Sequence, residues 1–271
     1  MKKAIVILNR NMPLLVNNFI KTLQNIDADI FVLENGSHPE NYSKYSTIFE
    51  INSYGIAWGL NKLMQHCYDL NYDYIWVNYN DVSIEKPKEF FEWAVNSIEN
   101  NPKIGVCNVF WGSQWDMSGN KTITANQQNN NFKNQMISFF DDLSFVVSKK
   151  ALQVISQTNH RLTPFFDSSN YTNHYGILAP AEMLYKAKMC MITNQQFIAQ
   201  ELRNPAELDS QNARGFDDKY WKETKGPEDI DKWLMSFYPE LSLLKISNKQ
   251  KRDTIIKRIC SYSNDYENEN C

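Results

Sequence analysis

The chain has 271 residues, of which 42% are hydrophobic and 13% aromatic, enough apolar material for one sizeable α/β core but little for a second. Its 28 basic and 31 acidic residues give a net charge of -3, which argues against a general nucleic-acid binder, because a surface that tracks phosphates normally carries a basic excess. No apolar run approaches the ~20 residues of a membrane span, so we expect a soluble protein.

The first half of the chain alternates strand-like and helix-like segments. Ala4–Leu8 is an apolar run typical of a central strand, Met12-Pro13 opens a helical pattern, and Ala28–Asn35 is the next predicted strand. The alternation continues with predicted strands at 45–52, 72–77 and 104–111 and predicted amphipathic helices at 55–70 and 86–101. This pattern predicts an α/β fold with a doubly wound, mostly parallel sheet, whose ligands bind at the carboxyl ends of the strands.

Three of these predicted strands end in polar residues. Asn9-Arg10 follow the first strand and Glu34-Asn35 end the second. The stretch YDYIWVNYNDVSI changes from apolar and aromatic side chains to amides and a carboxylate at residues 78–81. Because the carboxyl ends of parallel strands share one edge of a sheet, we expect these side chains to line one cleft. A simple polar turn is the alternative interpretation of 78–81.

The second half is less regular. Residues 112–134 are rich in Asn and Gln and lack an apolar period, so they form either a surface loop or a lid over a substrate. A strand and a helix are predicted over 143–157, and a further helix from about Ala181 precedes another strand. The end of the chain is helical with a polar tail, SYSNDYENENC, which we expect to be disordered. Five cysteines without ligand spacing indicate reduced thiols in a cytosolic protein.

Four stretches resemble, in order, the motifs of GT-A-fold glycosyltransferases of the large, family 2-like nucleotide-sugar group. IVILNRN is similar to their first strand and turn, FVLENGS to their second strand, NSYGIAWGLNKLM to their N-x-G-x-a-x-G-x-N stretch, and YIWVNYNDVSI to their strand ending in D-x-D or L-N-N-D-V. The resemblance implies a GT-A, Rossmann-like sheet followed by an acceptor-side region and terminal helices. It also implies an inverting transfer of a sugar from a UDP-, dTDP- or GDP-sugar to a hydroxyl acceptor, in polysaccharide or glycan synthesis.

The resemblance also implies a donor-binding set. Glu34 replaces the aspartate that accepts hydrogen bonds from the nucleotide base, and Gly55 and Gly59 would let the backbone approach the ligand. Tight helix packing is an alternative explanation of both glycines, and a solvated strand end is the alternative for Glu34. The implied set comprises Leu8, Asn9, Arg10, Glu34, Asn35, Asn52, Gly55, Asn61, Asn80 and Asp81.

A divalent cation, Mn²⁺ or Mg²⁺, is the implied cofactor. A leaving nucleotide diphosphate carries several negative charges, which a cation held by carboxylate and amide oxygens neutralises. Asp81 is the implied metal ligand. Tyr79 stands where the family has its first acidic residue, so only one carboxylate of the motif remains, with Asn78 and Asn80 as neutral partners.

An inverting transfer needs a general base that takes the proton of the acceptor hydroxyl. FFDSS resembles the family's F-D-E-like segment and AEMLYKAK resembles the helix that follows, but Ala179-Pro180 stand where the acidic pair of the family lies. The candidates are therefore Asp167, Glu182 and His174. Asp141-Asp142 precede the strand LSFVV, either as a strand cap or as residues near the substrates.

The expected organisation is a GT-A domain over 1–227, with a nucleotide-sugar half at 1–111 and an acceptor half at 112–227, and a helical extension over 228–271. The partners are a nucleotide-sugar donor and a glycan or lipid-linked acceptor, without nucleic acid. The stretch at 245–259 is basic and carries isoleucines. It is either a solvated helix or an amphipathic helix that touches anionic lipid, so the location is cytoplasmic with peripheral membrane contact as an alternative.

Two other functions compete with sugar transfer. A nucleotidylyltransferase shares the sheet but needs a glycine-rich basic loop after the first strand, and LNRNMPLLV has no glycine. A degenerate GT-A-like protein that binds a sugar or nucleotide, or that acts as a scaffold, is favoured by Tyr79 and by Ala179-Pro180 in place of acids.

Overall fold

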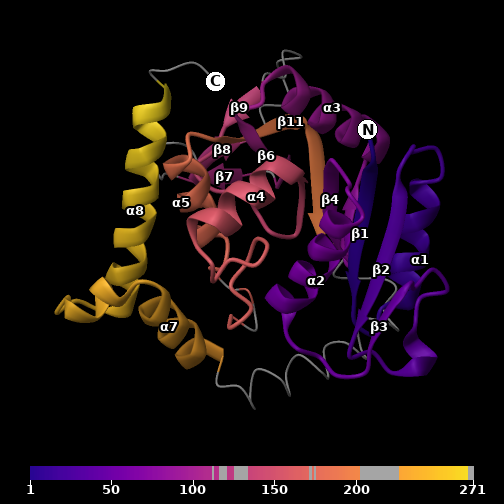
Figure 1. The fold of residues 1–271 in the computed structure, drawn as a ribbon, viewed down its shortest axis with the longest axis horizontal. Helices are drawn as coiled ribbons and strands as arrows, with labels where there is room; N and C mark the ends of the chain where they lie inside the picture. The colour runs from indigo at the N-terminus through magenta and orange to yellow at the C-terminus, as the bar shows by residue number, and fades with distance from the viewer. Residues whose placement is uncertain are drawn as a thin grey trace.

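A computed structural model describes residues 1–111, 113–115, 121–124, 134–170, 173, 175–201 and 226–267. Within these residues the strands form one nine-stranded sheet and a separate two-stranded sheet (Figure 1). The large sheet has the order β3-β2-β1-β4-β10-β6-β11-β5, with β9 paired to β11. The strands of the large sheet are β1 (Lys3–Asn9), β2 (Asp29–Asn35), β3 (Ile48–Glu50), β4 (Tyr74–Tyr79), β5 (Val82–Ile84), β6 (Ile104–Phe110), β9 (Asn134–Met136), β10 (Ser144–Ser148) and β11 (Cys190–Glu201). The small sheet pairs β7 (Ser113–Trp115) with β8 (Lys121–Thr124).

The order of the strands confirms the predicted doubly wound, mostly parallel sheet. β1 pairs in parallel with both β2 and β4, and β2 pairs in parallel with β3. β10 lies antiparallel between β4 and β6, and β6 pairs in parallel with β11. The antiparallel β10 joins the first four strands to the second half of the sheet, so both halves of the chain share one core.

Helices cover the sheet, and proline sets where two of them begin. They are α1 (Pro13–Thr22), α2 (Ile56–Asp69), α3 (Pro87–Asn100), α4 (Lys149–Thr158), α5 (Leu178–Lys186), α7 (Gly226–Phe237) and α8 (Asn248–Glu267), with short 3₁₀ turns η1 (Pro39–Asn41) and η2 (Pro239–Leu243). Proline is favoured in a first helical turn because its missing N–H has no partner there anyway. Both proline-opened helices, α1 and α3, start where the sequence predicts.

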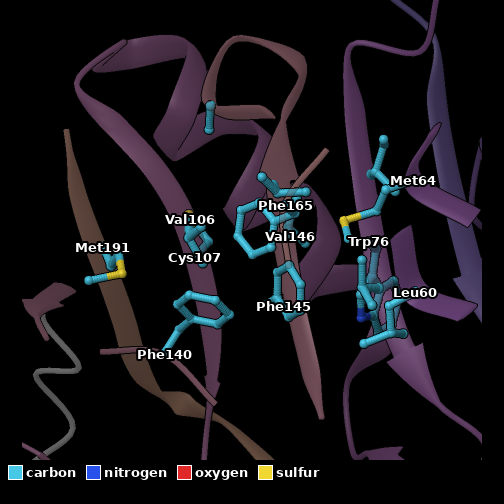
Figure 2. Close-up of a cluster of buried hydrophobic side chains, with 14 of the residues drawn as sticks. Leu60, Met64, Trp76, Val106, Cys107, Phe140, Phe145, Val146, Phe165 and Met191 are labelled. Atoms are coloured by element: carbon cyan, nitrogen blue, oxygen red, sulfur yellow. The ribbon is translucent and has the colours of Figure 1, made fainter. Parts of the chain in front are cut away.

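The central strands are buried on both faces, as their continuous apolar runs require. All seven residues of β6 are buried, and Trp76 of β4 is fully buried with its indole N–H donating to Ser144 Oγ at 2.9 Å. Leu60 and Met64 of α2 lie beside Trp76 in Figure 2. Burying a large aromatic or aliphatic side chain stabilises a fold by about 1.5–3 kcal/mol, so this layer contributes much of the driving force for folding.

A second aromatic layer joins β10 to the segment before α5. The rings of Phe145 and Phe165 are stacked with their centroids 5.5 Å apart, and the Phe140 ring lies 4.9 Å from that of Phe145 (Figure 2). Phe165 immediately precedes Phe166 and Asp167, so the packing fixes the backbone of the segment that carries one predicted catalytic residue.

The C-terminal extension packs on the body of the molecule. Ile255 and Ile259 of α8 are fully buried, and α8 lies along α5 (Figure 1). The predicted disorder of the tail is wrong for residues 261–267, because α8 continues to Glu267. A helix anchored by buried isoleucines can extend by further turns even through polar residues. The remainder of the predicted tail, 268–271, lies outside the described residues.

Two further expectations concern membranes and cysteines. Among the described helices, none combines the length and the apolar character required to cross a bilayer. Cys67, Cys107 and Cys260 are free, buried thiols, and burial raises the pKa of Cys67 to about 12.

Candidate active site

The carboxyl ends of β1, β2 and β4 meet at one edge of the sheet. In the parallel ladders Asn9 lies opposite Glu34, and Leu8 lies opposite Tyr79. The polar residues that end these strands are therefore neighbours, as the sequence predicts. Hydrogen bonds join Asn9 to Glu34 and to Asn80, and a separate hydrogen bond joins Tyr79 to Asp142. With Asp81, which follows Asn80 in the turn, we call these residues the strand-end cluster: Asn9, Glu34, Tyr79, Asn80, Asp81 and Asp142.

The Glu34 carboxylate is fully buried and accepts hydrogen bonds only from neutral donors. Asn9 Nδ2 lies 3.0 Å and 2.9 Å from its two oxygens, and Ser37 Oγ and the Ser43 backbone N–H lie 2.5 Å and 2.8 Å away. Ser46 Oγ donates to the same carboxylate. These donors satisfy the hydrogen-bonding capacity of the buried carboxylate. Since a carboxylate has about four acceptor sites, Glu34 organises the wall of the site and leaves little capacity for a ligand.

Asn9 links Glu34 to the turn that carries Asp81. Its Nδ2 donates to Glu34, and its Oδ1 accepts from Asn80 Nδ2 at 3.1 Å and from the Met12 backbone N–H at 3.3 Å. Both ends of one buried amide are thus in use, which fixes its orientation. Asn9 thus connects Glu34 to Asn80, which is the residue before Asp81.

Asn78 explains why the buried strand β4 ends in an amide. It is fully buried, and its Nδ2 donates to the carbonyl oxygens of Tyr79 and Val82 at 2.8 Å and 3.1 Å. These two carbonyls flank the Asn80-Asp81 turn between β4 and β5. An apolar residue in this position would leave both carbonyls without that donor, so Asn78 holds the turn that presents Asp81.

Tyr79 brings in a carboxylate from the neighbouring strand. Its hydroxyl donates to Asp142 Oδ2 at 2.8 Å, just before β10 begins, and Asn173 Nδ2 donates to the same oxygen at 2.6 Å. Burial and the Asp142 charge raise the pKa of Tyr79 well above its usual value, so the phenol stays protonated. Asp142 itself is only partly buried. The tyrosine that replaces the family's first acid therefore contacts an acid supplied by another segment.

The remaining donor-site candidates lie around the start of α2. Asn35 Nδ2 donates to the Gly55 carbonyl at 3.0 Å, and Asn35 Oδ1 accepts from the Tyr54 N–H at 3.3 Å. Gly55 has a φ of +96°, a conformation that favours glycine. A Cβ on Gly59 would lie 2.6 Å from a methyl group of Leu8, so close helix packing requires this glycine.

Three candidates have other surroundings. Asn61 clasps the backbone of Phe166: its Oδ1 accepts from the N–H at 2.9 Å and its Nδ2 donates to the C=O at 2.7 Å. Asn52 is exposed on the loop after β3, and Arg10 is half-buried after β1. Asn61 therefore joins α2 to the segment that carries Asp167.

Asp167 is anchored by charge and by the C-terminal extension. Its Oδ2 lies 2.5 Å from Arg161 Nη2 and 3.1 Å from Trp233 Nε1 of α7. Its Oδ1 accepts from the backbone and hydroxyl of Ser169 at 3.0 Å and 2.7 Å. This carboxylate is buried and neutralised by an arginine.

Glu182 is also buried and ion-paired. Its Oε1 lies 2.9 Å from Lys186 Nζ and 3.2 Å from Arg258 Nε, and the Tyr238 hydroxyl lies close enough that Glu182 helps to raise the pKa of that phenol. Its partners come from α5, α8 and the residue before η2. The third predicted base, His174, lies outside the described residues.

The strand-end cluster offers oxygen ligands for a hard cation. Asp81 carries a carboxylate and Asn80 an amide oxygen, both in the turn that follows β4. In the described part of the chain, no three His, Cys, Asp or Glu residues gather as a complete metal cage. Mg²⁺ and similar ions bind through one or two carboxylates when phosphates supply the rest, so the donor set fits a cation that arrives with a diphosphate.

No known family model matches the sequence, and no curated protein shows significant similarity to it. Solved structures do share the fold. GalNAc-T7, solved with UDP, GalNAc and Mn²⁺, superposes with a TM-score of 0.56 at 7% identity, over 74% of this chain and 44% of that one. Residues 1–349 of TarS from S. aureus give a TM-score of 0.54 at 10% identity, over all of this chain and 74% of theirs.

A longer S. aureus TarS structure gives a TM-score of 0.55 over 96% of this chain and 43% of that one. The present chain thus spans less than half of GalNAc-T7 and of the longer TarS. These neighbours are GT-A glycosyltransferases, and the sheet described above has the GT-A fold that the resemblance implies. At such low identity the likeness concerns the fold, and function is argued from the site.

Proposed function

We propose that this protein is a glycosyltransferase that moves a sugar from a UDP-, dTDP- or GDP-sugar to a hydroxyl acceptor, with inversion, in polysaccharide or glycan synthesis. One observation carries the proposal: Asn9 bridges Glu34 to Asn80, next to Asp81, where the strands of a GT-A sheet end. That edge is where open α/β sheets bind ligands. The UDP and Mn²⁺ named for GalNAc-T7 support the same donor class.

The strand-end cluster would receive the donor diphosphate. Asp81 would hold a divalent cation, which when bound neutralises the leaving diphosphate. Asn9 and Asn78 keep the Asn80-Asp81 turn in place, and Asn35 fixes the backbone around Gly55. Glu34 would keep Asn9 oriented toward Asn80 through the hydrogen bonds that its carboxylate accepts.

We assign the general base to Asp142. Asp167 and Glu182 are buried and bound by arginines, whereas Asp142 is partly exposed and lies against the Tyr79 hydroxyl at the end of β4. In the transfer the acceptor oxygen bonds to the anomeric carbon, its proton passes to the Asp142 carboxylate, and the diphosphate oxygen leaves with the electrons of the broken bond. Correct placement of such a base contributes about 10²- to 10⁴-fold to rate.

A sugar-nucleotide hydrolysis assay tests the proposal without knowledge of the acceptor. Wild type, Asp81→Ala and the surface control Asp27→Ala are incubated with UDP-, dTDP- and GDP-sugars and Mn²⁺. Asp27 has a side chain 99% exposed and pairs only with Lys3 among the described residues, so its loss removes a surface carboxylate outside the strand-end cluster. We expect slow release of nucleotide from one donor class, lost in Asp81→Ala and kept in Asp27→Ala. Equal, negligible release by all three proteins would contradict the proposal.

A degenerate sugar- or nucleotide-binding scaffold is the second candidate. It is favoured by the ion pairs of Asp167 and Glu182, because two predicted bases serve the fold. This function predicts nucleotide binding with no turnover on any donor or acceptor. Binding that depends on Asp81, combined with turnover that depends on Asp142, would decide for the enzyme.

A further inference from the structure

The segment that joins η2 to α8 exposes apolar side chains to solvent. Leu243 is 81% exposed, Leu244 39% and Ile246 38%, whereas Leu241, two residues earlier, is 1% exposed. We call residues 243–246 the apolar turn. Figure 1 shows the junction of α7 and α8 at the outer end of the molecule, away from β1, β2 and β3.

The apolar side of α8 is already used in packing. Ile255 and Ile259 are fully buried and Cys260 is 5% exposed, so they face the body of the protein, where α8 lies along α5. The sequence-based alternative, that 245–259 presents isoleucines to lipid as an amphipathic helix, is therefore wrong for Ile255 and Ile259. Any apolar contact from this region must come from the apolar turn instead.

Basic residues surround the apolar turn. Residues 243–258 contain six Lys or Arg and one Asp. Lys245, Lys249 and Lys257 are exposed, whereas Arg258 is occupied by Glu182 and Glu240. Exposed lysines thus flank the leucines along the chain, with Lys245 inside the apolar turn and Lys249 at the start of α8. This pairing of an apolar tip with a basic frame is the combination that a bilayer surface with anionic headgroups attracts.

We propose that the apolar turn inserts into the interface of an anionic membrane, with Lys245 and Lys249 contacting the headgroups. A second copy of the chain fits the surface poorly, because it would bring like charges together and a stable dimer buries about 800 Å² on each partner, more than three side chains provide. Insertion of a few apolar side chains gives only weak, reversible attachment to a membrane. The exposed lysines add an electrostatic attraction to anionic headgroups. The inference does not depend on the proposed sugar transfer.

Vesicle co-sedimentation tests the surface with the full chain. Wild type is spun with phosphatidylcholine vesicles and with vesicles that also contain phosphatidylglycerol. We expect binding only to the anionic vesicles, weakened by added salt because exposed charges are screened. Equal binding to both vesicle types, or none to either, would overturn the proposal.

Matched variants separate the contribution of the apolar side chains from that of the lysines. Leu243→Asp/Leu244→Asp should reduce partitioning on the order of tenfold or more, because buried apolar groups set interfacial affinity. Ile51→Asp/Leu70→Asp is the control, since those side chains are 86% and 43% exposed and belong to other segments than the apolar turn. Lys245→Glu/Lys249→Glu should reduce binding to anionic vesicles only, compared with Lys44→Glu/Lys103→Glu. Circular dichroism confirms that all are folded.

Two outcomes would contradict the membrane surface. The leucine variant and its control binding vesicles equally well would exclude insertion of the apolar turn. A wild-type dimer in light scattering that the leucine variant converts to a monomer would assign the turn to a second copy. Nucleotide titration of the same proteins is a separate readout, so failure here leaves the strand-end cluster untouched, and the reverse also holds.

Discussion

The two halves of the molecule bury carboxylates in opposite ways. At the strand ends, Glu34 is surrounded by neutral donors from Asn9, serines and a backbone N–H, so its negative charge stays uncompensated by any cation in the described residues. In the second half of the chain, Asp167 and Glu182 are paired with Arg161 and Arg258. A buried carboxylate that is bonded only to neutral donors still attracts a cation. An arginine in an ion pair cancels that attraction. The difference predicts ligand chemistry in the first region and structural anchoring in the second.

The largest expected effect comes from replacing one carboxylate by an amide in each of the two regions. Asp142→Asn should lower turnover per folded molecule by about 10²- to 10⁴-fold, because the proton acceptor is lost while shape is kept. Asp167→Asn should change turnover little and lower stability instead. The measurement is the initial rate of sugar-nucleotide hydrolysis or transfer, with its pH profile, alongside a urea titration of each variant. A large loss of turnover in Asp167→Asn with little loss in Asp142→Asn would instead assign the general base to Asp167.

Breaking the buried ion pair between Arg258 and Glu182 should lower the stability of the fold. Arg258→Ala leaves the Glu182 carboxylate buried with Lys186 as its remaining partner, and we expect a loss of about 2–4 kcal/mol in the free energy of unfolding. Urea denaturation measures it. Lys88→Ala breaks the exposed pair with Glu92, which should matter by less than about 0.5 kcal/mol. Similar effects of the two substitutions would mean that the Glu182 cluster is not an anchor.

At the strand ends, Glu34→Gln should destabilise by about 1–3 kcal/mol, because an amide NH₂ would face the donors that the carboxylate accepts. Combined with Asn9→Ala, the loss should be smaller than the sum of the single losses, since the two side chains share hydrogen bonds. A double-mutant cycle in urea gives the coupling. Strict additivity would show that Asn9 does not bridge Glu34 to the Asp81 turn.

Tyr79→Phe should have the smallest effect, about 1 kcal/mol from one lost hydrogen bond to Asp142. The pKa of Tyr79 is raised in the folded state, so the folded protein holds this proton more tightly than the unfolded chain. Stability should therefore fall as the pH rises above the unfolded tyrosine pKa of about 10, and less steeply in Tyr79→Phe. Thermal melts across that range measure the slope; identical slopes would remove Tyr79 from this linkage.

The sequence predicted the features that depend on local pattern. Apolar runs gave the central strands, Pro13 and Pro87 gave two helix starts, and the parallel arrangement brought Asn9, Glu34 and Asn80 together. These follow from strand direction and helix chemistry, which short segments encode.

Contacts between distant segments were not predictable in this way. Asp142 reaches Tyr79 across 63 residues because β10 pairs with β4, and Asn61 clasps Phe166 across 105. A helix pattern could not show that Ile255 and Ile259 would pack inward, nor that Arg258 would reach Glu182. A signal for Asp142 was present in Asp141-Asp142 before a strand, but only the strand order made it a neighbour of Tyr79.

Isothermal titration with UDP, dTDP and GDP in the presence of Mn²⁺ tests most directly whether the strand-end cluster is a nucleotide-diphosphate site. We predict that wild type and Asp27→Ala bind one of these nucleotides, that binding falls when Mn²⁺ is withheld, and that Asp81→Ala loses it. Unchanged affinity in Asp81→Ala, or no binding of any of the three nucleotides to folded wild type, would contradict this assignment.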